Sequence, residues 1–267
     1  MGGRVGTVGS DVVFQVMRYD PRRDVEPYWA EYDVPVDEGD TVLMGLMRIR
    51  ESQDGSLGFR ASCRSGICGS DGMVINGRSR LACKTPVAAM VAMRGRVVLE
   101  PLRNLRYVKD LVVDQTPFWQ KFRRVEPYLM PAGAPPAEER RMVMPQEAFD
   151  LLSKASDCIF CEICYSECPI NGIDRGFLGP QALIKAFRFE FDPRDDGAAS
   201  RFAPLSNVEG AWRCRTTFNC TDSCPKGIPI TEGIQRLKKK LTAETLTGLT
   251  PAYRSPTPVE SPEDTSS

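Results

Sequence analysis

The sequence predicts an α+β protein in which a mixed strand-and-helix part is followed by a mostly helical part. Three observations predict this order. Runs rich in β-branched and aromatic residues, separated by turn signals, fill the chain as far as Val113–Thr116. Beyond that point, prolines punctuate segments whose apolar residues recur at helical spacing. Ten cysteines, none placed like half of a disulfide, fall into three groups along both parts.

The first part has the element order of a β-grasp ferredoxin domain, in which strands, a helix and a cysteine loop follow one another. Asp40 or Thr41 is the expected N-cap of the helix, because apolar residues recur at helical spacing directly afterwards. Asn76-Gly77 is the turn expected of a two-residue β-hairpin. The predicted elements are strands at Val12–Val16 and Tyr28–Val36, a helix at Val42–Ile49, a hairpin of Gly72–Ile75 and Arg78–Ala82, and a strand at Arg96–Glu100.

The second part is predicted to be a separate helical domain. We place the first domain at 10–115, the second at 116–247 and a tail at 248–267. The tail is rich in Pro, Ser, Thr and Glu, and we expect it to be disordered because it has too little apolar surface to bury. Helical patterns cover Glu147–Ser156, Gln181–Phe191 and the closing segment Ile230–Leu241.

Composition and charge exclude several classes of function. Lys plus Arg and Asp plus Glu both number 35, so no net charge favours a nucleic-acid partner. Histidine is absent, which excludes histidine-ligated haem, Rieske-type ligation and histidine-based catalysis within this chain. No apolar stretch approaches the roughly 20 residues of a membrane helix. Met1–Ser10 lacks the features of a signal peptide, so we expect cysteines that bind metal rather than form bridges.

The first cysteine group predicts a 2Fe–2S loop of the plant type. Cys63 and Cys68 have the C-x4-C spacing, and Cys83 follows the predicted hairpin. Asp71 stands where the plant-type pattern has a cysteine, and it is either a carboxylate ligand to iron or a turn residue of an incomplete loop. Glycines in this loop let the backbone wrap closely and direct N–H groups at sulfur. We predict that all four residues bind the cluster.

The other seven cysteines predict two clusters of unequal ligation. The first run, C-x2-C-x2-C-x3-C-P, has the spacing of bacterial-type ferredoxin ligands, in which the fourth cysteine binds the cluster of the other run. The second run is C-x2-T-x2-C-x3-C-P, so a threonine occupies one cysteine slot. The predicted 4Fe–4S ligands are Cys158, Cys161, Cys164 and Cys224, and the predicted 3Fe–4S ligands are Cys168, Cys214 and Cys220, with Thr217 over the open corner of that cluster.

Zinc and disulfides are the competing interpretations of these cysteines. Zinc is bound by closed sets of four ligands, whereas seven cysteines without histidine divide well only into four plus three. A disulfide framework is typical of secreted chains. Thioredoxin-like chemistry uses one C-x-x-C before a helix rather than three groups. Iron–sulfur clusters therefore fit this pattern better than the alternatives do.

Three unequal cysteine groups in this order, with Asp71 in the first and Thr217 in the third, resemble the iron–sulfur subunit family of succinate dehydrogenase, or respiratory complex II. The resemblance covers roughly Val12–Leu241. It implies a β-grasp domain, an all-α ferredoxin domain, and a subunit that transfers electrons without itself oxidising succinate. Its support outside the ligands comes from Pro101-Leu102, Val108–Val112, Leu178–Pro180, Arg194–Asp196 and Cys224–Gly227.

The resemblance also implies partners and a route for electrons. An FAD-bearing subunit would supply them, the 2Fe–2S, 4Fe–4S and 3Fe–4S clusters would carry them, and quinone at membrane-anchor subunits would receive them. The implied location is the cytoplasmic face of a bacterial plasma membrane, with the chain held peripherally through its anchors. Fumarate reductase and a free-standing multi-cluster ferredoxin are the alternatives, and Asp71 favours succinate dehydrogenase.

The sequence departs from the family pattern on the side where quinone is expected. Members usually carry a tryptophan pair shortly after the position of Pro169 and a histidine directly after that of Cys214. Here the first stretch is Ile170–Asp174, one residue shorter, and the second position is Arg215. Pro169 and Arg215 are the candidate quinone-side residues. We expect the membrane partner to hold quinone elsewhere or to receive the electron by another route.

Overall fold

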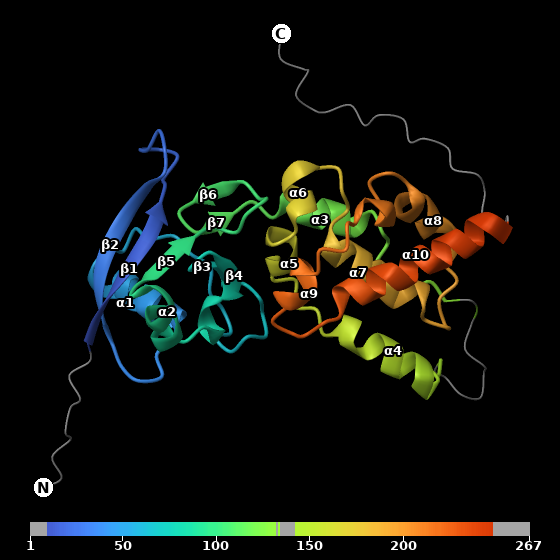
Figure 1. Cartoon of the computed structure of the whole chain (residues 1–267), viewed down its shortest axis with the longest axis horizontal. Coiled ribbons are helices and arrows are strands. Elements are labelled where there is room, and N and C mark those ends of the chain that lie inside the picture. Colours follow the sequence, from blue (N-terminus) through green and yellow to red (C-terminus); the bar gives the residue numbers. More distant parts are fainter. Residues whose placement is uncertain (1–9, 132, 134–141, 248–267) are drawn as a thin grey trace, which may run out of the picture.

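The computed structural model describes residues 10–131, 133 and 142–247, so the tail predicted to be disordered lies outside the described residues. A β-rich half (residues 10–113) and a helical half (residues 116–247) lie end to end along the longest axis (Figure 1). The order of the two halves is the one that the sequence predicts.

The β-rich half is built on a five-stranded mixed sheet. Its elements are β1 (Ser10–Arg18), β2 (Tyr28–Val36), α1 (Val42–Ser52), β3 (Gly72–Ile75), β4 (Arg78–Leu81), α2 (Val87–Arg94) and β5 (Val97–Glu100), followed by the small pair β6 (Tyr107–Lys109) and β7 (Val112–Val113). The strand order is β2-β1-β5-β3-β4. β1 pairs antiparallel with β2 and parallel with β5, while β3 pairs antiparallel with both β4 and β5. This is the sheet expected of a β-grasp domain.

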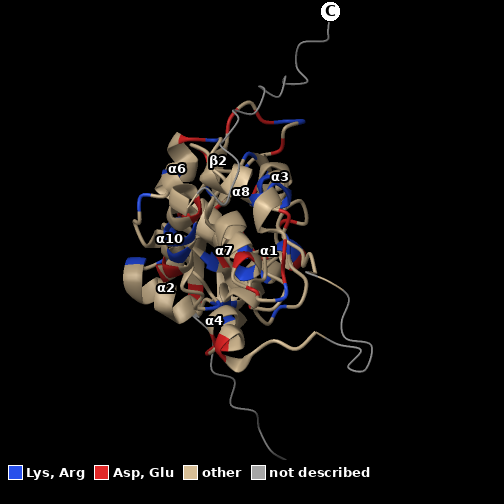
Figure 2. Cartoon of the chain, turned by 90° about the vertical axis from the view of Figure 1, so that its right-hand side faces the viewer, with Lys and Arg blue, Asp and Glu red and all other residues tan. Residues whose placement is uncertain are grey.

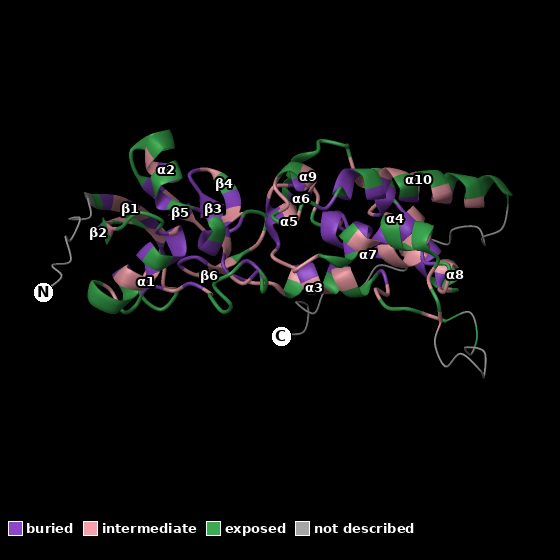
Figure 3. Ribbon diagram, turned by 90° about the horizontal axis from the view of Figure 1, so that it is seen from below, coloured by how far each residue is buried: buried purple, intermediate pink, exposed green. Residues whose placement is uncertain are grey.

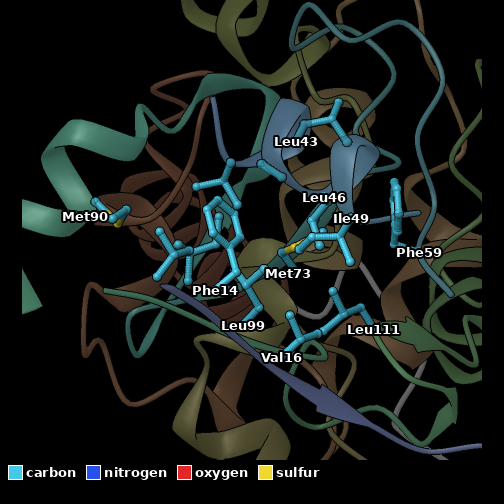
Figure 4. Packing of buried hydrophobic residues seen from close by; sticks show 14 of the residues in the cluster. Phe14, Val16, Leu43, Leu46, Ile49, Phe59, Met73, Met90, Leu99 and Leu111 are labelled. Carbon is cyan, nitrogen blue, oxygen red and sulfur yellow. The ribbon is translucent and has the colours of Figure 1, made fainter. Parts of the chain in front are cut away.

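Helix α1 packs its apolar stripe on this sheet. The hydroxyl of Thr41 accepts the backbone N–H of Met44 at 3.4 Å, which makes Thr41 the N-cap that the sequence predicts. Leu46 and Ile49, one helical turn apart, are fully buried against Phe14 and other core residues (Figure 4). The helix therefore closes the core of the β-rich half.

The helical half is organised around α7 (Pro180–Glu190), whose first eight residues are buried (Figure 3). The predicted helices α4, α7 and α10 are present, whereas α2, α3, α8 and three short helices are not among those predicted. The elements are α3 (Thr116–Arg123), α4 (Gln146–Ser156), α5 (Ile163–Ser166), α6 (Pro169–Ile173), α7 (Pro180–Glu190), α8 (Ala198–Ser206), α9 (Asn219–Asp222) and α10 (Ile230–Thr247).

Hydrogen bonds fasten the two halves together close to the cysteines. The side-chain amide of Asn104 donates to the backbone carbonyls of Tyr165 at 3.1 Å, Ser166 at 2.9 Å and Cys168 at 3.0 Å. The hydroxyls of Ser79 and Ser166 lie 2.8 Å apart in a buried contact. The β-rich half therefore fixes the backbone on which the first cysteine run lies.

The surface carries both signs of charge. Acidic and basic residues are interspersed over the helical end of the molecule (Figure 2), in keeping with the equal numbers of the two kinds. None of the helices in the described ranges has the length and apolar character needed to cross a membrane.

Candidate iron–sulfur sites

The first cysteine loop is exposed and surrounds sulfur with backbone donors. The Sγ of Cys63 accepts N–H groups from Ser65 at 3.4 Å, Ile67 at 3.3 Å and Cys68 at 3.2 Å. These donors lower the pKa of the Cys63 thiol to about 6. Thiolate is the form that binds iron, so this loop holds its sulfur ready for a metal.

Asp71 lies beside Cys83 on the inner side of the same loop. Its carboxylate is buried and accepts the backbone N–H of Cys83 at 2.6 Å. Burial, together with the neighbouring Asp71 carboxylate, raises the pKa of the Cys83 thiol to about 12. The carboxylate therefore lies beside the predicted ligand Cys83 and is shielded from solvent.

Four thiols line one cavity in the helical half, between the loop before α5 and the start of α10. Apolar side chains form much of the wall, including Ile184 of α7 and Ile230 of α10. Burial, together with negative charge on Cys158 and Cys224, raises the pKa of Cys161 to about 12. The structure thus brings the last cysteine of the second run to the first run. The four cysteines are Cys158, Cys161, Cys164 and Cys224.

Cys168, Cys214 and Cys220 form a second group in the helical half. Burial raises the pKa of Cys168, N–H groups of α6 lower it, and negative charge on Cys214 raises it. Burial also raises the pKa of Cys220, and negative charge on Cys168 and Cys214 adds to the effect. The Sγ of Cys220 lies 3.6 Å from the hydroxyl of Thr231. The three thiols are therefore close enough to influence one another.

The remaining candidate residues lie around this three-thiol group. Pro169 is the first residue of α6 and directly follows Cys168. Arg215 and Thr217 are exposed and lie in the segment between Cys214 and α9. Pro169 is exposed as well, so a partner could reach all three residues.

The thiol groups fit clusters better than they fit single ions. Among the described residues, no set of three or more Cys, Asp or Glu side chains could hold one metal ion. A cluster of several irons spaces its thiolate ligands farther apart than a single zinc ion does. The apolar surroundings of the buried groups also suit clusters, whose potentials depend on solvent exclusion.

The three groups lie in a row. A Cβ added to Gly69, in the first loop, would come within 2.6 Å of the carbonyl oxygen of Ile159 and 2.9 Å of the Cβ of Cys161. The first and second groups therefore meet backbone to backbone. Burial raises the pKa of Cys164 well above its usual value, and charges on cysteines of the second group and on Cys220 of the third act on it as well. Cys164 is thus the member of the second group next to the third, and it packs on the core cluster that contains Cys168 and Cys220.

Two residues near the sites, Asn104 and Glu162, are not singled out as candidates by the sequence analysis. Asn104 holds the carbonyls around Cys168, as described above. Glu162 is buried between Cys161 and Ile163, and burial raises the pKa of its carboxyl to about 7. A carboxylate inside a C-x2-C-x2-C motif is the only signal in the sequence that singles out Glu162.

Comparison with known proteins supports this arrangement. A family model described as "2Fe-2S iron-sulfur cluster binding domain" matches residues 13–120, and one described as "4Fe-4S dicluster domain" matches residues 154–228. The fumarate reductase iron-sulfur subunit of Mycobacterium tuberculosis is 42% identical over 88% of this chain and 93% of its own length. The succinate dehydrogenase iron-sulfur subunit of Coxiella burnetii is 33% identical over 89% of this chain and 100% of its own length.

A solved structure also shares the fold. The subunit matched in the Mycobacterium smegmatis Sdh1 complex in the apo form has a TM-score of 0.80 and 28% identity, covering 89% of this chain and 98% of that chain. The predicted fold class is therefore confirmed, with a 2Fe–2S ferredoxin domain before a helical ferredoxin domain. An electron-transfer role within an oxidoreductase complex follows from the same relatives. The chain belongs to the family of succinate dehydrogenase and fumarate reductase iron–sulfur subunits.

Proposed function

We propose that this chain is the iron–sulfur subunit of a succinate:quinone oxidoreductase. It would carry electrons from an FAD-bearing partner subunit to quinone at membrane-anchor subunits, on the cytoplasmic face of a bacterial plasma membrane. Clusters, when bound, accept and release single electrons. The observation that carries the proposal is the row of three thiol groups. It begins at the exposed first loop of the β-rich half and continues through the second group to the third.

Each group has a proposed cluster, and the ligands are those expected from the spacing. The acidic side chain in the first set would add a hard ligand to three thiolates, while the third set lacks a fourth ligand. The proposed domain boundaries, 10–115 and 116–247, separate the first set from the other two. The ligands are Cys63, Cys68, Asp71 and Cys83 for 2Fe–2S, Cys158, Cys161, Cys164 and Cys224 for 4Fe–4S, and Cys168, Cys214 and Cys220 for 3Fe–4S.

Exposed apolar side chains at both ends of the row support docking to partners. Ile67, at the tip of the first loop, is 62% exposed and would meet the flavoprotein. Ile173, Trp212 and Phe218 are all exposed, and each lies within five residues of a thiol of the third group. Apolar surface of this kind favours a protein partner. We therefore assign the anchor subunits and quinone to the side that also carries Arg215.

Electron paramagnetic resonance (EPR) of the purified complex tests the proposal. The oxidised complex should show a 3Fe–4S signal, and reduction by succinate should produce a 2Fe–2S signal. The isolated chain should not oxidise succinate, and adding the flavoprotein should restore activity with an artificial acceptor. Absence of the 3Fe–4S signal at full iron content, or succinate oxidation by the flavin-free chain, would contradict the proposal.

Fumarate reduction is the second candidate direction. The relatives from M. tuberculosis and Haemophilus influenzae, 42% and 36% identical, are named fumarate reductase subunits, whereas those from C. burnetii and Candida glabrata are named succinate dehydrogenase subunits. Asp71 favours the succinate direction. Rates of succinate oxidation by quinone and of fumarate reduction by quinol, measured on the same complex, decide between them. A faster quinol-driven reduction of fumarate would reverse our choice.

A further inference from the structure

Two buried lysines in the described part of the helical half lack a carboxylate partner. Lys121 and Lys185 are only 7% and 8% exposed. The two buried arginines of the described chain are satisfied differently. Arg18 pairs with Asp110 at 2.9 Å, and Arg201 pairs with Asp195 at 2.6 Å. A buried cation without an anion is costly, so the lysines need a source of negative charge that the described side chains do not provide.

Lys185 lies against the loop of the second thiol group. Its Nζ donates to the backbone carbonyl of Ala155 at 3.0 Å and lies 5.1 Å from the centre of the Phe160 ring. Phe160 stands between Cys158 and Cys161. The thiol that acts on the ammonium is that of Cys158, and the one carboxylate that acts on it, Asp157, is itself paired with an exposed lysine. Neutral acceptors therefore hold Lys185 beside the predicted 4Fe–4S ligands.

Lys121 lies against the segment that joins the second group to the third, and the thiol that acts on its ammonium is that of Cys168. Its Nζ donates to the hydroxyl of Tyr165 at 2.8 Å, and Tyr165 stands between Cys164 and Cys168. The carboxylates that act on it, Asp174 and Glu209, are each paired with an arginine. Burial lowers the pKa of Lys121 to about 8, which leaves the amine mostly protonated at neutral pH.

We propose that Lys121 and Lys185 are the buried counter-charges of the two clusters in the helical half and raise the reduction potentials of those clusters. The inference rests on the proposed function, because it takes the two ligand sets as given. Thiolate-ligated clusters carry net negative charge, which grows when an electron is added. A fixed positive charge nearby, in surroundings of low dielectric constant, stabilises the reduced form more than the oxidised form. The lysines do not bind iron. They act on the clusters through the positive charge that they place nearby, and they are therefore positioning residues.

Redox titration of the assembled complex, followed by EPR, tests the inference. Lys185→Met should lower the midpoint potential of the 4Fe–4S cluster most, and Lys121→Met should lower that of the 3Fe–4S cluster most. The 2Fe–2S potential should stay unchanged in both variants. Lys239→Met removes an exposed lysine of α10 and is the matched control, which should shift no potential.

The charge-preserving variants Lys185→Arg and Lys121→Arg separate charge from packing. They should keep the neighbouring potential near that of the unmodified complex. If a methionine variant loses its cluster, retention in the arginine variant also supports a counter-charge. Three outcomes overturn the inference. They are loss of the cluster in both the methionine and the arginine variant, an equal shift of the midpoint potential in both, and no shift in the methionine variant at full cluster occupancy. Absence of the two cluster signals in the unmodified complex would instead be a failure of the proposed function.

Discussion

The two halves of the molecule build their candidate cluster sites in opposite ways. In the β-rich half, three of four predicted ligands lie within Cys63–Asp71, and backbone N–H groups lower the pKa of the first thiol. In the helical half, the ligands come from two distant segments, and burial raises the pKa of thiols such as Cys164. The difference teaches that the first loop favours the thiolate form of Cys63 before metal arrives, whereas thiols that burial keeps protonated need the metal to stabilise their thiolates.

Removing the clusters should therefore affect the two halves unequally, and this is the largest effect we expect. Cys168 and Cys220 are buried within the core of the helical half, so without iron this core holds unligated thiols where a cluster would join its segments. Hydrogen exchange of the chelated chain should show most slow amides of the helical half lost and those of the β-rich half kept. Equal loss in both halves would break the comparison.

A single substitution should distinguish the two ligand sets of the helical half. Thr217→Cys restores the four-cysteine spacing, so we expect the 3Fe–4S site to take up a fourth iron and become 4Fe–4S. Its potential should fall, because the added thiolate brings negative charge. EPR should show the oxidised 3Fe–4S signal disappear while iron per chain rises by one atom. If the signal persists at full occupancy, Thr217 does not face the cluster.

Helix α1 and the crossing of the two cysteine runs could be predicted from the sequence, because both depend on local spacing. Thr41 and the apolar stripe after it identify the helix, and the C-x3-C-P pattern identifies the crossing. Helix α8 is not predicted because Pro204 lies inside it. Lys185 looks like an ordinary polar position of a predicted helix, and Lys121 lies in α3, which is not predicted; their burial is decided by packing against segments distant in sequence. These contacts join residues far apart in the sequence, so the spacing of apolar residues along the chain does not predict them.

Substitutions of Asp71 test whether the first site takes its ligands from its own loop. Asp71→Cys should keep the 2Fe–2S cluster, because a thiolate is the plant-type ligand at this position. Asp71→Ala should lower cluster occupancy, since it removes a ligand and also the acceptor of the Cys83 N–H. The 2Fe–2S signal per chain measures both effects. An unchanged intensity and potential in Asp71→Ala would show that Asp71 is not a ligand.

Gly69→Ala should show how closely the two halves depend on each other, with the smallest effect of the four. Gly69 has φ +69 and touches the backbone of the second thiol group, whereas Gly39 has φ +87 and nothing near its missing Cβ. Gly39→Ala should cost about 1 kcal/mol of stability from its backbone conformation alone. Gly69→Ala should cost about 1–3 kcal/mol more, because the two loops must separate. Denaturant unfolding measures the difference, and equal losses would mean that the loops do not press on each other.

The crossed arrangement of the helical cysteines has a consequence for biosynthesis. A nascent chain that has emerged from the ribosome as far as Ile173 carries the first cysteine run but neither complete ligand set, because each set takes thiols from beyond Ala211. The loop from Cys63 to Cys83 is complete much earlier. Translation therefore completes the proposed ligand sets in a fixed order: the 2Fe–2S set first, the 3Fe–4S set when Cys220 has emerged, and the 4Fe–4S set when Cys224 has emerged.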